Sequence, residues 1–119
     1  LLRDTGHVRE SLGIESALVS HFRAIKELHP LQVCLGRQAI TLEALGELNR
    51  ALEVLKEQEG VCRQLGNLRG VQMSLFNQAG VHRLLGNLDQ ALAVYKEDEK
   101  LCREEKKLDA LPKPWGNRP

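Results

Sequence analysis

The chain resembles itself after a step of 40 residues, and this internal repeat limits the possible fold more than any other feature. Residues 45–68 align without a gap to residues 85–108, and 12 of the 24 aligned positions are identical. Self-similarity at such a period is typical of arrays of stacked supersecondary units. An eroded version of the pattern precedes these two copies. We therefore expect a repeat array over residues 1–109, with a degenerate copy at 1–40, further copies at 41–80 and 81–109, and a proline-rich tail or cap at 110–119.

The apolar residues within each copy follow the spacing of a helix. Leu48, Leu52 and Leu55 are four and three residues apart, which places them on one helical face. Single glycines recur between such stretches at half the repeat period, and Gly just past a helix end adopts the left-handed conformation at little cost. Turns are predicted at Gly46, Gly66 and Gly86, between helices at about 7–28, 31–45, 48–65, 70–85 and 88–108.

The short connections between these five helices predict how the helices pack. Connections of a few residues force consecutive helices to lie antiparallel. One hairpin has too little core of its own, so the apolar faces are buried only by stacking. Aromatic residues make up only 3% of the chain, which suits thin layers of packed Leu and Ala. The predicted fold is therefore all-α, built from antiparallel helix hairpins.

Charge and cysteine content favour some classes of protein over others. The formal net charge of +1 gives no electrostatic footprint for nucleic acid. No apolar run approaches the roughly 20 residues of a membrane-spanning helix, and the first residues lack a signal-peptide pattern. Three cysteines, an odd number, fit a reducing compartment better than a disulfide framework. We expect a cytoplasmic protein that contacts neither membrane nor nucleic acid.

Small residues at the expected helix contacts resemble the tetratricopeptide repeat (TPR) family. Ala39 and Ala79 stand where that family places a small residue in the first helix of a hairpin, and Ala51 and Ala91 stand where it places one in the second. The period of 40 exceeds the family's usual period of about 34 and resembles the long repeats of Pins-type adaptors and nephrocystin-3-like arrays. Leu35 and its later counterpart depart from the family, which often has an aromatic residue there. The resemblance implies a right-handed α-α superhelix.

The same resemblance implies a function as a protein-interaction scaffold. In TPR proteins the first helices line a concave groove that holds a partner peptide or helix, and Asn77 matches an asparagine that holds the ligand backbone. Arg37 is its counterpart one copy earlier, and an acidic partner segment is expected if Arg37 and Arg83 both face the groove. The predicted partner-binding residues are Val33, Arg37, Glu43, Met73, Asn77 and Arg83.

Two other roles are compatible with the sequence. The array could be a regulatory or sensor segment of a larger signalling ATPase or transcriptional regulator that acts through intramolecular contacts. It could also self-associate through the apolar helix faces at its ends.

No residue pattern predicts catalysis, a metal site or a cofactor. Cys62 and Cys102 are one period apart, and the first copy has Phe22 in that position, so these cysteines are interpreted as core packing. His82 is expected on a first helix near the groove, where a surface or packing role is favoured over titration on partner binding. Trp115 is interpreted either as a cap over the last helix or as part of a frayed tail.

Overall fold

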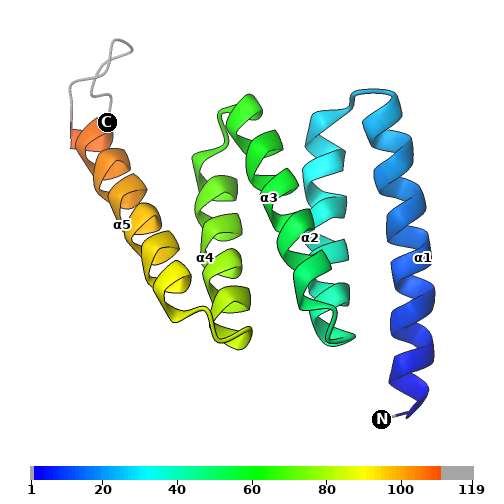
Figure 1. Cartoon of the computed structure of the whole chain (residues 1–119). Coiled ribbons are helices and arrows are strands. Elements are labelled where there is room, and N and C mark those ends of the chain that lie inside the picture. Colours follow the sequence, from blue (N-terminus) through cyan, green and yellow to red (C-terminus); the bar gives the residue numbers. More distant parts are fainter. Residues whose placement is uncertain (1, 111–119) are drawn as a thin grey trace.

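The computed structural model describes residues 2–110, with side chains for residues 6–106, and this part of the chain consists of helices joined by short turns (Figure 1). It contains no β-strand, which confirms the predicted all-α class. Trp115 and the rest of the predicted tail or cap lie outside the described residues. The helices are α1 (Leu2–Ala24), α2 (Leu28–Ala44), α3 (Leu48–Leu65), α4 (Leu68–Leu84) and α5 (Leu88–Ala110).

The helices stack in chain order. Each packs against its sequence neighbours, and neighbouring helices run in opposite directions, so that the connecting turns alternate between two ends of the stack (Figure 1). Within the described residues, no helix is both long enough and apolar enough to cross a bilayer.

Most of the buried apolar side chains fall into three clusters, and each cluster, with the partly buried residues packed against it, joins three consecutive helices. In the middle cluster, Ala39 of α2, Leu55 of α3 and Val81 of α4 are at most 1% exposed. A second cluster joins α1, α2 and α3 around Leu35, and a third joins α3, α4 and α5 around Leu75. Fully burying one such Leu or Val stabilises the fold by about 1.5–3 kcal/mol. Since every cluster needs three helices, no hairpin closes a core by itself.

The four turns share one hydrogen-bond pattern. In each, a residue with positive φ donates its N–H to the carbonyl three residues earlier, and the next residue donates to the carbonyl five residues before it. The predicted positions Gly46, Gly66 and Gly86 have φ of 78°, 70° and 83°. Lys26 occupies the same place in the first turn with φ of 58°. A side chain in this conformation costs about 1 kcal/mol, so the first turn is less favourable than the other three.

The observed helix ends differ from the predicted ends chiefly in α1, α2 and α4. α1 begins at Leu2 rather than near residue 7. α1 ends at Ala24 rather than near residue 28, because Lys26 forms a turn without glycine. α2 begins three residues earlier than predicted, since Pro30 falls in its first turn, where no N–H is needed. α4 begins two residues earlier than predicted, at Leu68. In α4 the Asn67 side chain caps the helix, accepting a hydrogen bond from the Gly70 N–H at 3.1 Å.

Alternate helices are also joined by ion pairs that recur with the repeat period. Arg23 of α1 pairs with Glu57 of α3 at 2.8 Å, and Arg63 of α3 pairs with Glu97 of α5 at 3.2 Å. These side chains are about half exposed, so each pair contributes little to stability, on the order of 0–1 kcal/mol. Their recurrence shows that α1 and α3 are related in the same way as α3 and α5.

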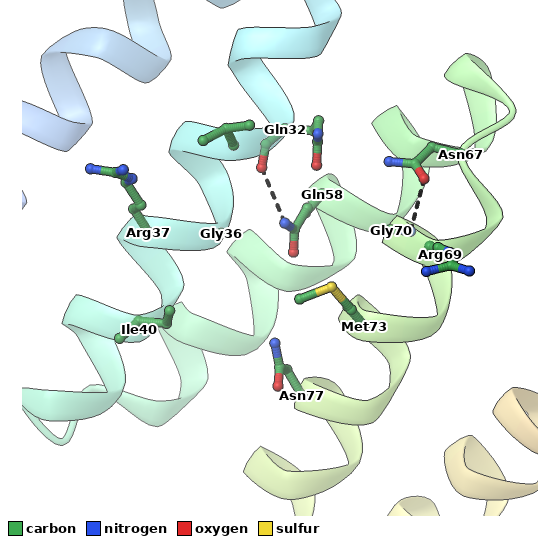
Figure 2. A pocket seen from close by; sticks show the side chains of 11 residues that line it. Gln32, Gly36, Arg37, Ile40, Gln58, Asn67, Arg69, Gly70, Met73 and Asn77 are labelled. Atoms are coloured by element: carbon green, nitrogen blue, oxygen red, sulfur yellow. Dashed lines mark hydrogen bonds between the residues drawn. The ribbon is translucent and has the colours of Figure 1, made fainter.

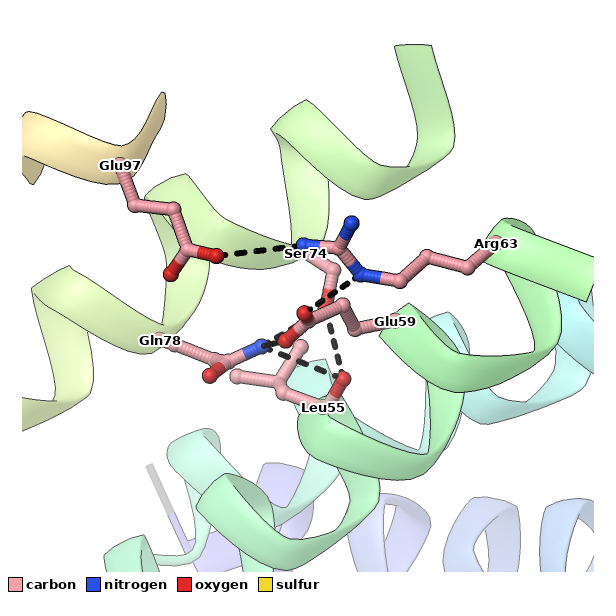
Figure 3. A network of polar contacts seen from close by, with 6 residues as sticks. All are labelled: Leu55, Glu59, Arg63, Ser74, Gln78 and Glu97. Carbon is pink, nitrogen blue, oxygen red and sulfur yellow. Dashed lines mark hydrogen bonds and ion pairs between the residues drawn. The ribbon is translucent and has the colours of Figure 1, made fainter. Parts of the chain in front are cut away.

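Polar side chains also fix α4 on α3 (Figure 3). The fully buried Ser74 Oγ donates to the Leu55 carbonyl at 2.6 Å, and Gln78 Nε2 donates to Glu59 Oε1 at 2.9 Å. Buried polar groups must be paired to avoid a desolvation cost of about 1–3 kcal/mol each. The network therefore favours one position of α4 along α3, and that position fixes which α4 residues face α2.

Candidate functional site

Three hollows lie in a row across the helices. The central hollow, between α2 and α4, measures about 360 Å³; one between α1 and α2 measures about 180 Å³, and one between α4 and α5 about 260 Å³. Arg37 lines both the central and the α1/α2 hollow, and Met73 and Asn77 line both the central and the α4/α5 hollow. Because neighbouring hollows share residues, they form one continuous surface. We refer to the residues that line these three hollows as the groove.

Helical spacing brings the walls of the central hollow together (Figure 2). Val33, Arg37 and Ile40 of α2 are four and three residues apart and therefore share a face. Met73 and Asn77 lie at the matching positions of α4 and point toward α2 and α3, whereas the Arg37 side chain extends toward α1. The sequence periodicity thus gives the two walls the same register.

The floor of the central hollow is polar. Gln58 of α3 donates its Nε2 to the Gln32 carbonyl at 3.1 Å. A Cβ at Gly36 would lie 2.7 Å from that nitrogen, so the glycine leaves the space that the Gln58 amide occupies. This floor ties α2 to α3 directly beneath the exposed side chains of the walls.

Four of the six predicted partner-binding residues line the central hollow, namely Val33, Arg37, Met73 and Asn77. Glu43 and Arg83 do not line it. Each lies six residues beyond Arg37 or Asn77, and six residues turn a helix by about 600°, which leaves them about 120° away from the groove-facing side. Arg83 is exposed, whereas Glu43 is half-buried and burial raises its pKa. The expectation that both face the groove is therefore wrong.

Groove residues that the sequence interpretation missed include Ile40 and Arg69 of the central hollow and Phe76 of the α4/α5 hollow. Their spacing carried the signal. Ile40 is three residues from Arg37, Arg69 is four residues from Met73, and Phe76 is three residues beyond Met73, all on one helical face.

Charges and amides in the central hollow are chemically complementary to a peptide. In the described part of the chain, Arg37 and Arg69 are the charged residues that line it, and no carboxylate does. Guanidinium groups pair with carboxylates in bidentate geometry. Amides of residues such as Asn77 offer both a donor and an acceptor, as a peptide backbone requires.

The α4/α5 hollow combines apolar walls with one carboxylate. Phe76 is 58% exposed and packs edge-on against Tyr95, with ring centroids 5.8 Å apart. Asp98 and the half-buried Cys102 line the α5 side. Burial raises the pKa of Asp98, and its Oδ1 has no hydrogen-bond partner within the described residues.

His82 lies elsewhere, contrary to the expectation that it is near the groove. His82 is 6% exposed, and together with Lys56 and Gln90 it lines a separate hollow of about 370 Å³. This hollow shares no lining residue with the groove. Burial, and secondarily the charge of Lys56, lowers the pKa of His82. Both effects favour the neutral imidazole over the charged form.

The interpretation of the cysteines as core packing fits Cys62, whereas Cys102 is half-buried and lines the α4/α5 hollow. Cys34 and Cys62 are buried, and burial raises the pKa of Cys62, which disfavours its reactive thiolate form. Among the described residues, no cluster of three or more His, Cys, Asp or Glu side chains could hold a metal ion.

At the end of the described stack, α5 leaves apolar surface uncovered. Leu48 and Leu52 of α3 pack against the middle cluster, but their counterparts Leu88 and Leu92 of α5 are 64% and 54% exposed. This surface is distinct from the groove, because neither residue lines any of its three hollows.

Comparison with protein-family models, curated proteins and solved structures found no match to this chain. The geometry and chemistry of the groove therefore carry the functional argument.

Proposed function

We propose that this protein is a TPR-type scaffold whose helix hairpins form a superhelix and bind a partner peptide in the groove. The 40-residue period, the recurring turn geometry and the recurring ion pairs between alternate helices support this assignment. The scaffold acts by binding and performs no chemistry of its own.

The observation that carries the proposal is the row of exposed apolar side chains along the groove. Val33, Ile40, Met73 and Phe76 are 49%, 63%, 67% and 58% exposed. Single exposed apolar residues are ordinary, but a contiguous group rimmed by polar residues is typical of an interaction site. These side chains are available to pack against apolar residues of the partner.

The polar residues of the groove favour an extended peptide with an acidic residue. Arg37 and Arg69 provide positive charge, while Asn77 can hold the peptide backbone. Neighbouring helix axes lie about 8–10 Å apart and an extended chain covers about 3.3 Å per residue, so about ten residues would cross the three hollows.

A displayed library of random peptides about ten residues long tests this function. We expect peptides with apolar and acidic residues to be enriched on the wild-type protein. Replacing Asn77 with alanine is expected to weaken their binding about tenfold, the effect of losing one or two hydrogen bonds. Fluorescence anisotropy of labelled peptides measures the affinity, and circular dichroism should show unchanged helicity and melting.

Asn49→Ala is the matched control, because Asn49 is exposed on α3 and does not line the groove. It should bind the selected peptides as tightly as the wild type. If Asn77→Ala also binds them at full affinity, the proposed groove function is contradicted.

A further inference from the structure

The floor of the α4/α5 hollow differs from that of the central hollow at two positions: Phe76 stands one repeat period after Gly36, and a carboxylate replaces the amide. Asp98 is the counterpart of Gln58, one repeat period later. Gln58 satisfies its amide by donating to the Gln32 carbonyl at 3.1 Å. An ionised carboxylate has no proton to donate, so Asp98 cannot repeat this bond to α4.

No neighbouring side chain among the described residues compensates for this loss. Gln72, the counterpart of Gln32, could have offered a donor to Asp98, but its Nε2 donates to Glu105 Oε2 at 2.7 Å. Asp98 Oδ1 is buried without a donor within the described residues, and burial raises the pKa of this carboxyl. A buried, unpaired carboxylate is costly, so a cation brought to this hollow would relieve an existing cost.

One other groove carboxylate has a buried, unpartnered oxygen, but its surroundings differ. Glu15 lines the α1/α2 hollow, and Arg37 supplies positive charge to that same hollow. Among the residues that the structure describes, Asp98 is the one charged residue that lines the α4/α5 hollow, where its neighbours include Met73, Phe76 and Cys102. The local imbalance of charge is therefore specific to Asp98.

The apolar neighbours suit a long cationic side chain. Lys and Arg bury their alkyl stems on apolar surface while their charged ends reach a polar group. Phe76 and Met73 offer such surface and are more than half exposed. A bound peptide that covers these side chains excludes water, which strengthens the attraction between the bound cation and Asp98.

We propose that the α4/α5 hollow takes a Lys or Arg side chain of the partner peptide, with Asp98 as its counter-charge. This inference rests on the proposed function and extends it, because an acidic residue is expected at Arg37 in the central hollow. The groove then selects a dipolar segment and orients it. Arg37 is on α2 and Asp98 is on α5, with α4 between them. Two helix spacings of about 8–10 Å each, covered by an extended chain at about 3.3 Å per residue, place the two charges about five to six residues apart.

The peptides selected from the random library provide the test. Peptides whose binding depends on Asn77 should be enriched for Lys or Arg at the predicted spacing from an acidic residue. The basic residue should stand on the same side of the acidic residue in all of these peptides. Asp98→Asn should weaken binding of these peptides about tenfold or more, whereas Glu104→Gln, which removes a charge from an exposed position of the same helix, should leave it unchanged. Asp98→Gln restores the residue type of Gln58 and provides a second uncharged variant.

A charge exchange separates a direct contact from a general effect on folding. The Asp98→Lys variant is tested with a peptide in which Glu replaces the selected basic residue. The variant should bind this peptide more tightly than the wild-type protein does. If Asn77-dependent peptides show no basic preference and bind Asp98→Asn at full affinity, this inference is wrong while the groove function stands. If no selected peptide depends on Asn77, both are contradicted.

Discussion

Replacing Leu55 with alanine is expected to lower the free energy of unfolding by about 2–5 kcal/mol. Leu55 is 1% exposed and packs in the cluster that joins α2, α3 and α4, so removing its methyl groups leaves a cavity between three helices. Urea denaturation followed by circular dichroism measures the change. This loss is a large fraction of the total stability, because a domain of this size is stable by only about 5–15 kcal/mol.

Leu84→Ala is the matched control for this prediction. Leu84 is 64% exposed at the end of α4, so the same chemical change should alter stability by no more than about 0.5 kcal/mol. Equal effects of the two substitutions would show that Leu55 is not held between helices as described.

Replacing Ala39 with aspartate is expected to abolish the cooperative fold. Ala39 is 1% exposed, in the same cluster as Leu55 and Val81. An aspartate there is both larger than the available space and charged without a partner, a combination expected to cost more than about 4 kcal/mol. Far-UV circular dichroism should show reduced helicity and no sharp thermal transition.

Ile40→Asp tests the adjacent position. Ile40 is 63% exposed in the groove, so this protein should remain folded and melt within a few degrees of the wild type. A cooperative melt of Ala39→Asp at the wild-type temperature would contradict the orientation of α2 in the stack.

The overall helical organisation was predictable because local chemistry determines it. Glycines spaced at half the repeat period predicted three of the four turns, and these have the expected left-handed backbone. The first turn was misplaced because Lys26 stands where the others have glycine. Only the regular interval between the glycines, extended backward from Gly46, would have indicated it.

Part of the groove was predictable for the same reason. Val33 and Arg37 share a face of α2, Met73 and Asn77 share the matching face of α4, and the four line the central hollow together. The placement of Glu43 and Arg83 in the groove was wrong, since six residues do not return a helix to the same face. His82 was misplaced because its direction depends on how α4 is rotated between α3 and α5, and residue type does not report that rotation.

The distinctive feature of Asp98 could not be predicted from the sequence alone. The change from Gln58 to Asp98 between copies resembles ordinary variation of a polar residue. Its meaning depends on the hydrogen bond that Gln58 makes and on the use of the Gln72 amide by Glu105, both of which are contacts between helices.

Nuclear magnetic resonance mapping of a bound peptide tests the central claim most directly. Titrating the labelled protein with the tightest selected peptide should shift the signals of groove residues, chiefly Arg37, Met73, Asn77 and Asp98, with little change elsewhere. Shifts centred instead on Lys56 and His82, or on the exposed face of α5 at Leu88 and Leu92, would contradict the assignment of the groove as the partner-binding site.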